Sequence, residues 1–173
     1  IAVFLPKFGM IGGNRRDIMI KITGAAESGS LDELKRLLDK NVLADLTADL
    51  NVRGLDNWTA LHFAANEGHL EIVKDLKVGG IEIDPISSIN RTPLHLACIR
   101  GHTPIVRLLV QMRANVNARD NDENTPLHYA SEFGHFECII YLIKEAGADA
   151  LAKNKFNYNP SDIAQNIEIR KLF

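Results

Sequence analysis

One tetrapeptide recurs through the chain at a fixed interval and constrains the fold more than any other feature. It reads TALH from Thr59 and TPLH from Thr92 and Thr125, so each copy begins 33 residues after the one before. A fixed period of this length predicts a repeat architecture, in which short units stack because no unit can bury its apolar faces alone. A glycine–histidine pair keeps the same spacing, beginning at Gly68, Gly101 and Gly134.

Each unit carries the features of two short helices. The threonine of the tetrapeptide provides a hydroxyl that caps exposed N–H groups, and Pro93 and Pro126 occupy a first helical position, where no N–H is needed. The glycine of the Gly-His pair favours the left-handed backbone of a helix end. Apolar residues then recur at helical spacing, as in Leu61, Ala64 and Ala65 of one helix and Leu70, Ile72, Val73 and Leu76 of the next.

The order of turn, TPLH-type helix, Gly-His turn, second helix and A-D-V-N-type return resembles the ankyrin-repeat family. The resemblance covers about residues 17–173. It implies an all-α repeat solenoid of helix-turn-helix pairs joined by β-hairpin-like loops. We therefore predict a non-repeat N-terminal arm over residues 1–16 and an ankyrin-repeat domain over 17–173, with units at about 17–53, 54–86, 87–119, 120–153 and 154–173.

The ends of the array depart from the repeat and leave alternatives open. Asp17–Leu38 aligns as a divergent first helix pair, with Ile22 in the place of Leu61. A six-residue insertion in 39–47 either lengthens a helix or forms a loop. The final unit is either a shortened cap or the support for a further repeat. The arm over 1–16 either folds over the first helix pair or docks a partner.

The hairpin tips lack a glycine that is usual in the family. The corresponding positions hold Asn57, Asn90, Glu123 and Asn157. Asparagine tolerates a positive φ, whereas glutamate adopts it less readily. The third tip, at Glu123, is therefore predicted to be distorted.

Composition and residue spacing argue against catalysis, nucleic-acid binding and membrane insertion. The formal net charge is −2, which creates no general attraction for phosphate backbones, and no apolar run reaches the length of a membrane span. All six histidines belong to the repeat motif, so none is left for a metal or a general base. Cys98 and Cys138 fall at core positions and match no zinc spacing. We predict no enzyme activity and no cofactor or metal.

A partner is expected to contact the positions that vary between units, because the repeat-defining positions hold the core. These positions lie on the hairpin tips and on the concave, exposed edge of the first helices, and we call them the variable strip. Trp58 is the only tryptophan, and aromatic and arginine residues dominate interface hot spots, although Trp58 has the alternative of packing on a neighbouring tip. The predicted partner-binding residues are Leu55, Trp58, Glu67, Ile89, Arg91, Ile99, Arg100, Asn124, Phe133, Phe156 and Tyr158.

The resulting functional prediction is a noncatalytic protein-interaction module, an adaptor or an assembly subunit of a larger complex, that binds a protein partner. The alternative is a regulatory or targeting domain of a larger enzyme whose catalytic part lies outside this chain. The absence of a membrane span or disulfide pattern favours the cytosol. The sequence does not identify the partner.

Overall fold

The computed structural model describes residues 15–38, 51, 53–78 and 80–173. Residues 1–14 of the expected arm and the whole of the predicted insertion in 39–47 lie outside these ranges.

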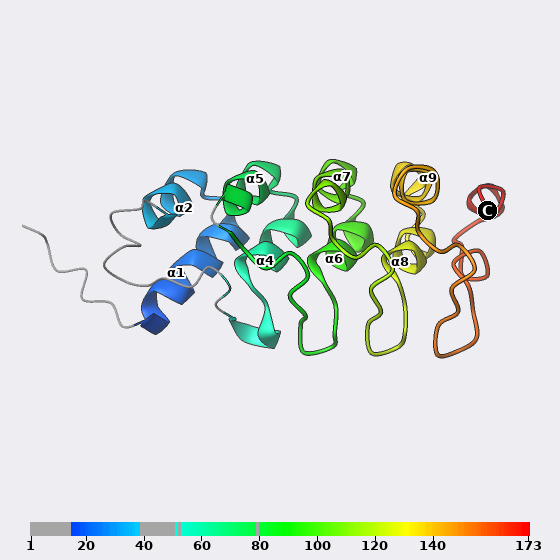
Figure 1. Ribbon diagram of the computed structural model, residues 1–173, viewed down its shortest axis with the longest axis horizontal. Coiled ribbons are helices and arrows are strands. Elements are labelled where there is room, and N and C mark those ends of the chain that lie inside the picture. Colours follow the sequence, from blue (N-terminus) through cyan, green and yellow to red (C-terminus); the bar gives the residue numbers. More distant parts are fainter. Residues whose placement is uncertain (1–14, 39–50, 52, 79) are drawn as a thin grey trace, which may run out of the picture.

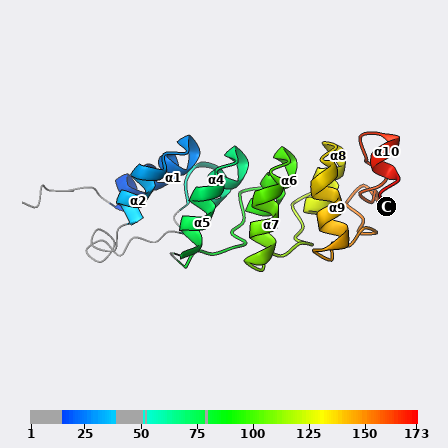
Figure 2. The same ribbon diagram turned by 90° about the horizontal axis from the view of Figure 1, so that it is seen from above.

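Two rows of helices run along the molecule (Figures 1 and 2). Each first helix packs against the first helix of the next unit and against its own second helix, which also contacts the second helix of the next unit. The inner row consists of α1 (Arg15–Ser28), α4 (Ala60–Glu67), α6 (Pro93–Arg100) and α8 (Pro126–Glu132). The outer row consists of α2 (Leu31–Leu38), α5 (Leu70–Val78), α7 (Thr103–Gln111) and α9 (Phe136–Lys144).

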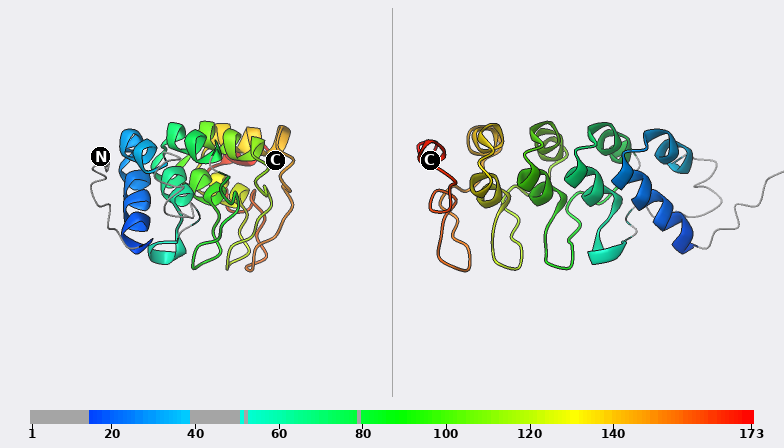
Figure 3. Two further views of the ribbon diagram at one scale, coloured as in Figure 1. Left: turned by 60° about the vertical axis from the view of Figure 1, so that its left-hand side comes forward. Right: turned by 180° about the vertical axis from the view of Figure 1, so that it is seen from behind.

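The loops that join successive units project from one side of the helices as hairpin-like tips (Figures 1 and 3). The first tip contains a short 3-10 helix, η1 (Leu55–Asn57), and the described ranges contain no β-strand. The helix pair expected over Asp17–Leu38 is present as α1 and α2, although α1 begins two residues earlier. The all-α solenoid predicted from the repeat is therefore the observed architecture.

Each inner helix from α4 to α8 begins at a threonine that is bonded to the histidine three residues later. The backbone N–H of the threonine donates to histidine Nδ1 over 3.1 Å in all three units. This arrangement closes a capping box and stabilises the helix start. The three pairs are Thr59 with His62, Thr92 with His95, and Thr125 with His128.

The same histidines join their own unit to the next one. Because Nδ1 accepts a hydrogen bond, Nε2 carries the proton and donates to a backbone carbonyl of the following tip. The acceptors lie 3.0 to 3.1 Å away and 29 or 30 residues ahead in the sequence. They are the carbonyls of Arg91, Asn124 and Tyr158.

The histidines of the Gly-His pairs make the opposite connection, to the preceding unit. Their Nε2 atoms bond the carbonyl groups near the C-terminal ends of the preceding inner helices, at 2.9 to 3.1 Å. Each ring lies against a glycine of that unit, where a side chain would collide with it. The pairs are His69 with Glu27, His102 with Asn66, and His135 with Ile99. All six histidines are therefore structural, as the sequence predicts.

The core is a continuous apolar layer between the two helix rows. The largest fully buried side chains of this core repeat from unit to unit. Cys98 and Cys138 also belong to the core. Burial raises the pKa of both thiols, and Cys138 Sγ lies 3.2 Å from the hydroxyl of Thr103. The prediction that both cysteines are core residues is confirmed.

The last unit replaces the repeat motif with other polar groups. Asn159 and Asp162 exchange hydrogen bonds between backbone and side chain in the place of a Thr-His pair, but a turn forms there and not a helix. Gln165 covers Gly134 as a histidine covers the earlier glycines, and its N–H donates to the carbonyl of Ser131 over 3.0 Å. A short helix, α10 (Ile167–Arg170), follows.

The buried histidines make the stability of the fold depend on pH. Burial lowers the pKa of His62 and His95 to about 4, whereas an unfolded histidine titrates near 6.5. Only the unfolded chain gains protons between these values, so stability is fully present above pH 6.5 and falls as the pH drops toward 4. We predict a loss of roughly 2 to 3 kcal/mol per histidine by pH 4 in urea unfolding. The variant His95→Gln should show a shallower pH dependence, and parallel profiles would contradict this account.

A second prediction separates backbone strain from the contact between glycine and histidine. Gly101 and Gly147 have nearly the same φ, 73° and 72°. An added methyl group at Gly101 would lie 2.7 Å from Cε1 of His135, whereas Gly147 has nothing within 4 Å. Gly147→Ala should cost about 1 kcal/mol for the left-handed backbone, and Gly101→Ala about 1 to 3 kcal/mol more for the overlap. The measurement is chemical denaturation of both variants. Equal losses would show that the histidine contact contributes nothing.

Candidate partner-binding surface

The second, third and fourth tips share one backbone geometry. In each, the N–H of the first residue donates to the carbonyl of the residue four positions later. Its carbonyl accepts the N–H of the residue three positions later, and these bonds measure 2.9 to 3.1 Å. The fourth residue has a positive φ, and the values at Asn90, Glu123 and Asn157 are 60°, 60° and 66°. The predicted distortion of the third tip is therefore wrong. The hydrogen bonds that close the turn hold Glu123 in a conformation that its side chain disfavours by about 1 kcal/mol.

A side-chain acceptor at the first position also stabilises each of these tips. The acceptor receives the backbone N–H groups of the residues two and four positions later, at 2.9 to 3.3 Å. The acceptors are Ser87, Asp120 and Asn154. Gly54 holds this place in the first tip and has no side chain. There the turn forms η1, in which Asp56 and Asn57 both have a positive φ.

Backbone hydrogen bonds connect each tip to the next one. Ser88 donates to the carbonyl of Asp56 at 2.8 Å, Asn121 to that of Ile89 at 3.1 Å, and Lys155 to that of Asp122 at 2.9 Å. The tips therefore lie in register, and equivalent positions form rows that run along the molecule (Figure 3).

The side chains of the tips are also joined by ion pairs. Arg53 pairs with Glu82, Arg119 with Glu123, and Lys155 with Asp122. These pairs are largely exposed, so each contributes at most about 1 kcal/mol to stability.

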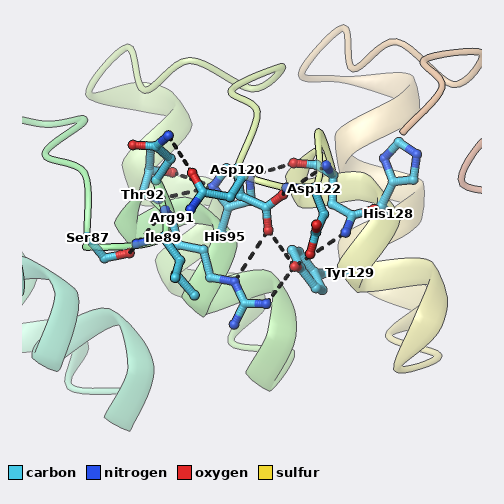
Figure 4. Close-up of polar contacts among 12 residues, drawn as sticks. Ser87, Ile89, Arg91, Thr92, His95, Asp120, Asp122, His128 and Tyr129 are labelled. Carbon is cyan, nitrogen blue, oxygen red and sulfur yellow. Dashed lines mark hydrogen bonds and ion pairs between the residues drawn. The ribbon is translucent and has the colours of Figure 1, made fainter. Parts of the chain in front are cut away.

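A buried cluster links the second and third tips to helix α8 (Figure 4). The phenol of Tyr129 donates to Asp120 Oδ2 at 2.5 Å, and Arg91 Nη2 donates to the same phenol oxygen at 2.6 Å. Arg91 Nε lies 3.5 Å from Asp120 Oδ2, and its guanidinium lies 4.7 Å from the centre of the Tyr129 ring. Burial, followed by the interaction with Asp120, raises the pKa of Tyr129 to about 12, so the phenol remains a donor.

Tyr129 was not among the residues predicted from the sequence. It occupies the repeat position that Phe63 and Leu96 hold in the two preceding inner helices. Both of these residues are apolar. A tyrosine at the same position indicates a polar partner nearby, because a buried phenol needs a hydrogen-bond partner.

Most of the variable strip is accessible. The structure describes no side chain for Leu55. The half-buried members are Trp58, Arg91, Ile99 and Asn124, and the exposed members are Glu67, Ile89, Arg100, Phe133, Phe156 and Tyr158.

Several of these side chains already have partners within the chain. Trp58 packs edge-on against Phe63, with the ring centres 4.9 Å apart, and lies over His62, so it contacts its own inner helix. The side-chain oxygen of Asn124 accepts a hydrogen bond from Asn154 at 2.8 Å. Such contacts restrict the rotamers before a partner arrives.

The C-terminal ends of the inner helices carry the other members of the strip. Arg100 Nε donates to Asn66 at 3.2 Å, and Asn66 donates to Glu67. Phe133 stacks on His135 with the ring centres 6.4 Å apart and remains half exposed. The strip therefore combines apolar, basic and acidic groups.

Some exposed apolar residues lie outside the predicted strip. They occupy neither tip nor inner-helix positions, to which the predicted strip is confined. They include Ile86, Phe136, Leu151 and Ile167. Leu151 is the most exposed of them, at 79%. It occupies the repeat position that holds Asn51, Asp84 and Asn117 in the earlier units, where each side chain accepts a backbone N–H from the next unit.

Neither a membrane-spanning helix nor a metal-binding cluster is found among the described residues. None of their helices combines the length and apolarity needed to cross a bilayer. Nor do these residues include a group of three or more His, Cys, Asp or Glu side chains placed to hold a metal ion.

Comparison with known protein families agrees with the architecture. A family model described as ankyrin repeats (many copies) matches residues 22–76, and a model described as ankyrin repeats (3 copies) matches residues 75–154. Together these matches cover most of the helix pairs described above. The chain belongs to the ankyrin-repeat family, whose members generally serve as protein-interaction modules.

Two curated proteins are similar to part of the chain. Oxysterol-binding protein-related protein 1 of Homo sapiens is 31% identical over 68 residues, and the protein of that name from Rattus norvegicus is 30% identical over 66 residues. The matches cover 37% and 36% of this chain and 7% of each relative. The chain thus spans a small part of the length of these relatives.

The cluster around Asp120 yields a stability prediction. Asp120→Ala should destabilise the fold by about 2 to 4 kcal/mol, because Tyr129, Arg91 and two backbone N–H groups lose a buried acceptor. Asp122→Ala is the matched control, since its exposed carboxylate makes only a 3.9 Å ion pair, and it should cost less than about 0.5 kcal/mol. Urea unfolding of both variants decides the matter. A loss at Asp120 as small as that at Asp122 would contradict a structural role for the cluster.

Proposed function

We propose that the chain is a noncatalytic adaptor or assembly subunit that binds a protein partner through the variable strip. The observation that carries the proposal is the alignment of the tips by backbone hydrogen bonds, which places exposed variable side chains in continuous rows. The side chains at these positions differ from unit to unit, while the positions that hold the stack are repeated. Such a surface offers many distinct contacts without affecting the fold.

The composition of the strip supports protein binding. It contains exposed aromatic side chains, including Phe156 at 62% and Tyr158 at 53%, and also the arginine residues Arg91 and Arg100. Aromatic and arginine side chains supply most of the binding energy at protein interfaces, whereas scattered surface carboxylates and lysines supply little. The strip is therefore the best-suited surface among the described residues for a protein partner.

The test compares two triple variants with equal apolar content. The strip variant is Ile89→Ser, Phe133→Ser and Tyr158→Ser, and the control variant is Phe136→Ser, Leu151→Ser and Ile167→Ser. All six side chains are substantially exposed, so both variants should fold. The intact chain captures a partner from native lysate, and the affinity of the purified pair is then measured for each variant by calorimetry.

We expect the strip variant to lose at least about tenfold in affinity, because buried aromatic anchors each contribute 1 kcal/mol or more. The control variant should bind as the unchanged chain does. Circular dichroism and thermal melting verify that both variants are folded. If the control variant loses the partner and the strip variant keeps it, the proposal is wrong.

A second candidate is that these repeats form the regulatory or targeting part of a larger enzyme. The match to a short part of much longer relatives favours a larger parent protein. An antibody against the repeats distinguishes the two candidates on an immunoblot of the source cells. A band near 19.2 kDa supports an independent subunit, and a much larger band supports the second candidate.

A further inference from the structure

Arg91 has hydrogen-bond donors that the fold does not use. A guanidinium has five N–H groups. Nε points to Asp120 and one N–H of Nη2 bonds the phenol of Tyr129. Within the described part of the chain, the two N–H groups of Nη1 have no hydrogen-bond acceptor. The side chain is 30% exposed, so these donors remain available to a partner.

The orientation of Arg91 is fixed before binding. The guanidinium is held at two points and stacked on the ring of Tyr129 (Figure 4). A free arginine loses considerable rotamer entropy when it is immobilised at an interface. Most of that loss has already occurred here, so the affinity for a correctly placed acceptor is correspondingly higher.

The carboxylate that compensates Arg91 is hidden from a partner. The side chain of Asp120 is 3% exposed and receives the phenol of Tyr129, the guanidinium and two backbone N–H groups. A partner that approaches the strip therefore meets the cation and not the anion. Arg100 adds a second exposed cation at the end of helix α6.

The row of repeat positions that contains Arg91 holds aromatic side chains on both sides of it. The corresponding positions are Trp58 in the preceding tip, Asn124 in the third tip and Tyr158 in the fourth. Ile89, in the same tip as Arg91, adds an exposed apolar side chain, at 44%. The order along this row is thus aromatic, cationic, amide and aromatic.

We propose that the variable strip recognises a short partner segment that carries an aspartate or glutamate between apolar side chains, with the carboxylate bound by Arg91. A planar carboxylate accepts two parallel N–H groups of a guanidinium, which gives the pairing its directional specificity. This inference rests on the proposed function, because it specifies the chemistry of the partner at the same surface.

The probe is a peptide selected on the intact chain from a displayed library of short random peptides, because folded domains commonly recognise short linear segments. The enriched peptide is synthesised with its acidic residue and with the matching amide, Glu→Gln or Asp→Asn. The dissociation constants of both peptides are then measured by fluorescence anisotropy for the unchanged chain and for Arg91→Gln. Arg113→Gln is the matched control, since Arg113 is exposed in the turn after the outer helix α7.

We expect the amide to weaken binding to the unchanged chain and to the Arg113→Gln control by about tenfold or more. For Arg91→Gln, the dissociation constants of the acid and amide peptides should differ by less than about twofold, because the guanidinium that binds the carboxylate is absent. If Arg91 served only the fold, the acid and amide peptides would differ equally on every variant, which would overturn the proposal.

A further variant guards against a loss of structure at position 91. Arg91→Lys keeps a positive charge opposite Asp120 but lacks the planar fork, so it should remain folded by circular dichroism and discriminate acid from amide less than arginine does. If the lysine variant discriminated acid from amide as well as arginine does, positive charge alone, and not the oriented guanidinium, would account for recognition of the carboxylate.

The remaining outcomes separate this inference from the proposed function. Enriched peptides that lack an acidic residue but lose binding on the strip variant overturn the inference and leave the proposed function intact. Peptides that bind every strip variant equally well contradict both. A selection that enriches no peptide overturns the inference. The proposed function is then still tested by the capture of a folded partner and the affinity of the strip variant for it.

Discussion

The stack depends on an imidazole that makes one hydrogen bond within its own repeat and another to the next. Nδ1 of His62, His95 and His128 accepts the backbone N–H of the capping threonine, and this fixes the proton on Nε2, which donates to the following tip. A local event, the start of a helix, is thereby coupled to the spacing between units. Because the rings are buried, these bonds form away from competing water and their loss leaves unsatisfied polar groups.

A second set of histidines ties each unit backward, and the two sets together determine where the variable side chains lie. Gly29, Gly68 and Gly101 leave room for the rings of the following unit, so the inner helices align. The tips are aligned in turn by their own backbone bonds. A residue that contributes nothing to the stack is therefore held at a defined place on one face, where it is available to a partner.

Architecture and recognition overlap at one cluster. Arg91 is a variable residue, yet it belongs to a buried network with Asp120 and Tyr129. The network restricts its side chain and hides the anion that balances it. Similar restriction applies to Trp58, which packs on its own helix.

The sequence by itself determined the repeat, the helix starts and ends of its full-strength units and the place of all six histidines in the repeat motif, because each of these follows from chemistry within one unit repeated at a fixed spacing. Only the tertiary structure decided how units meet. It placed Tyr129 beside Arg91, which is 38 residues away, showed that turn hydrogen bonds hold Glu123 at a positive φ, and located the irregular tip at Gly54. These features depend on side chains from different repeats, whose contacts no periodic pattern along one helix specifies.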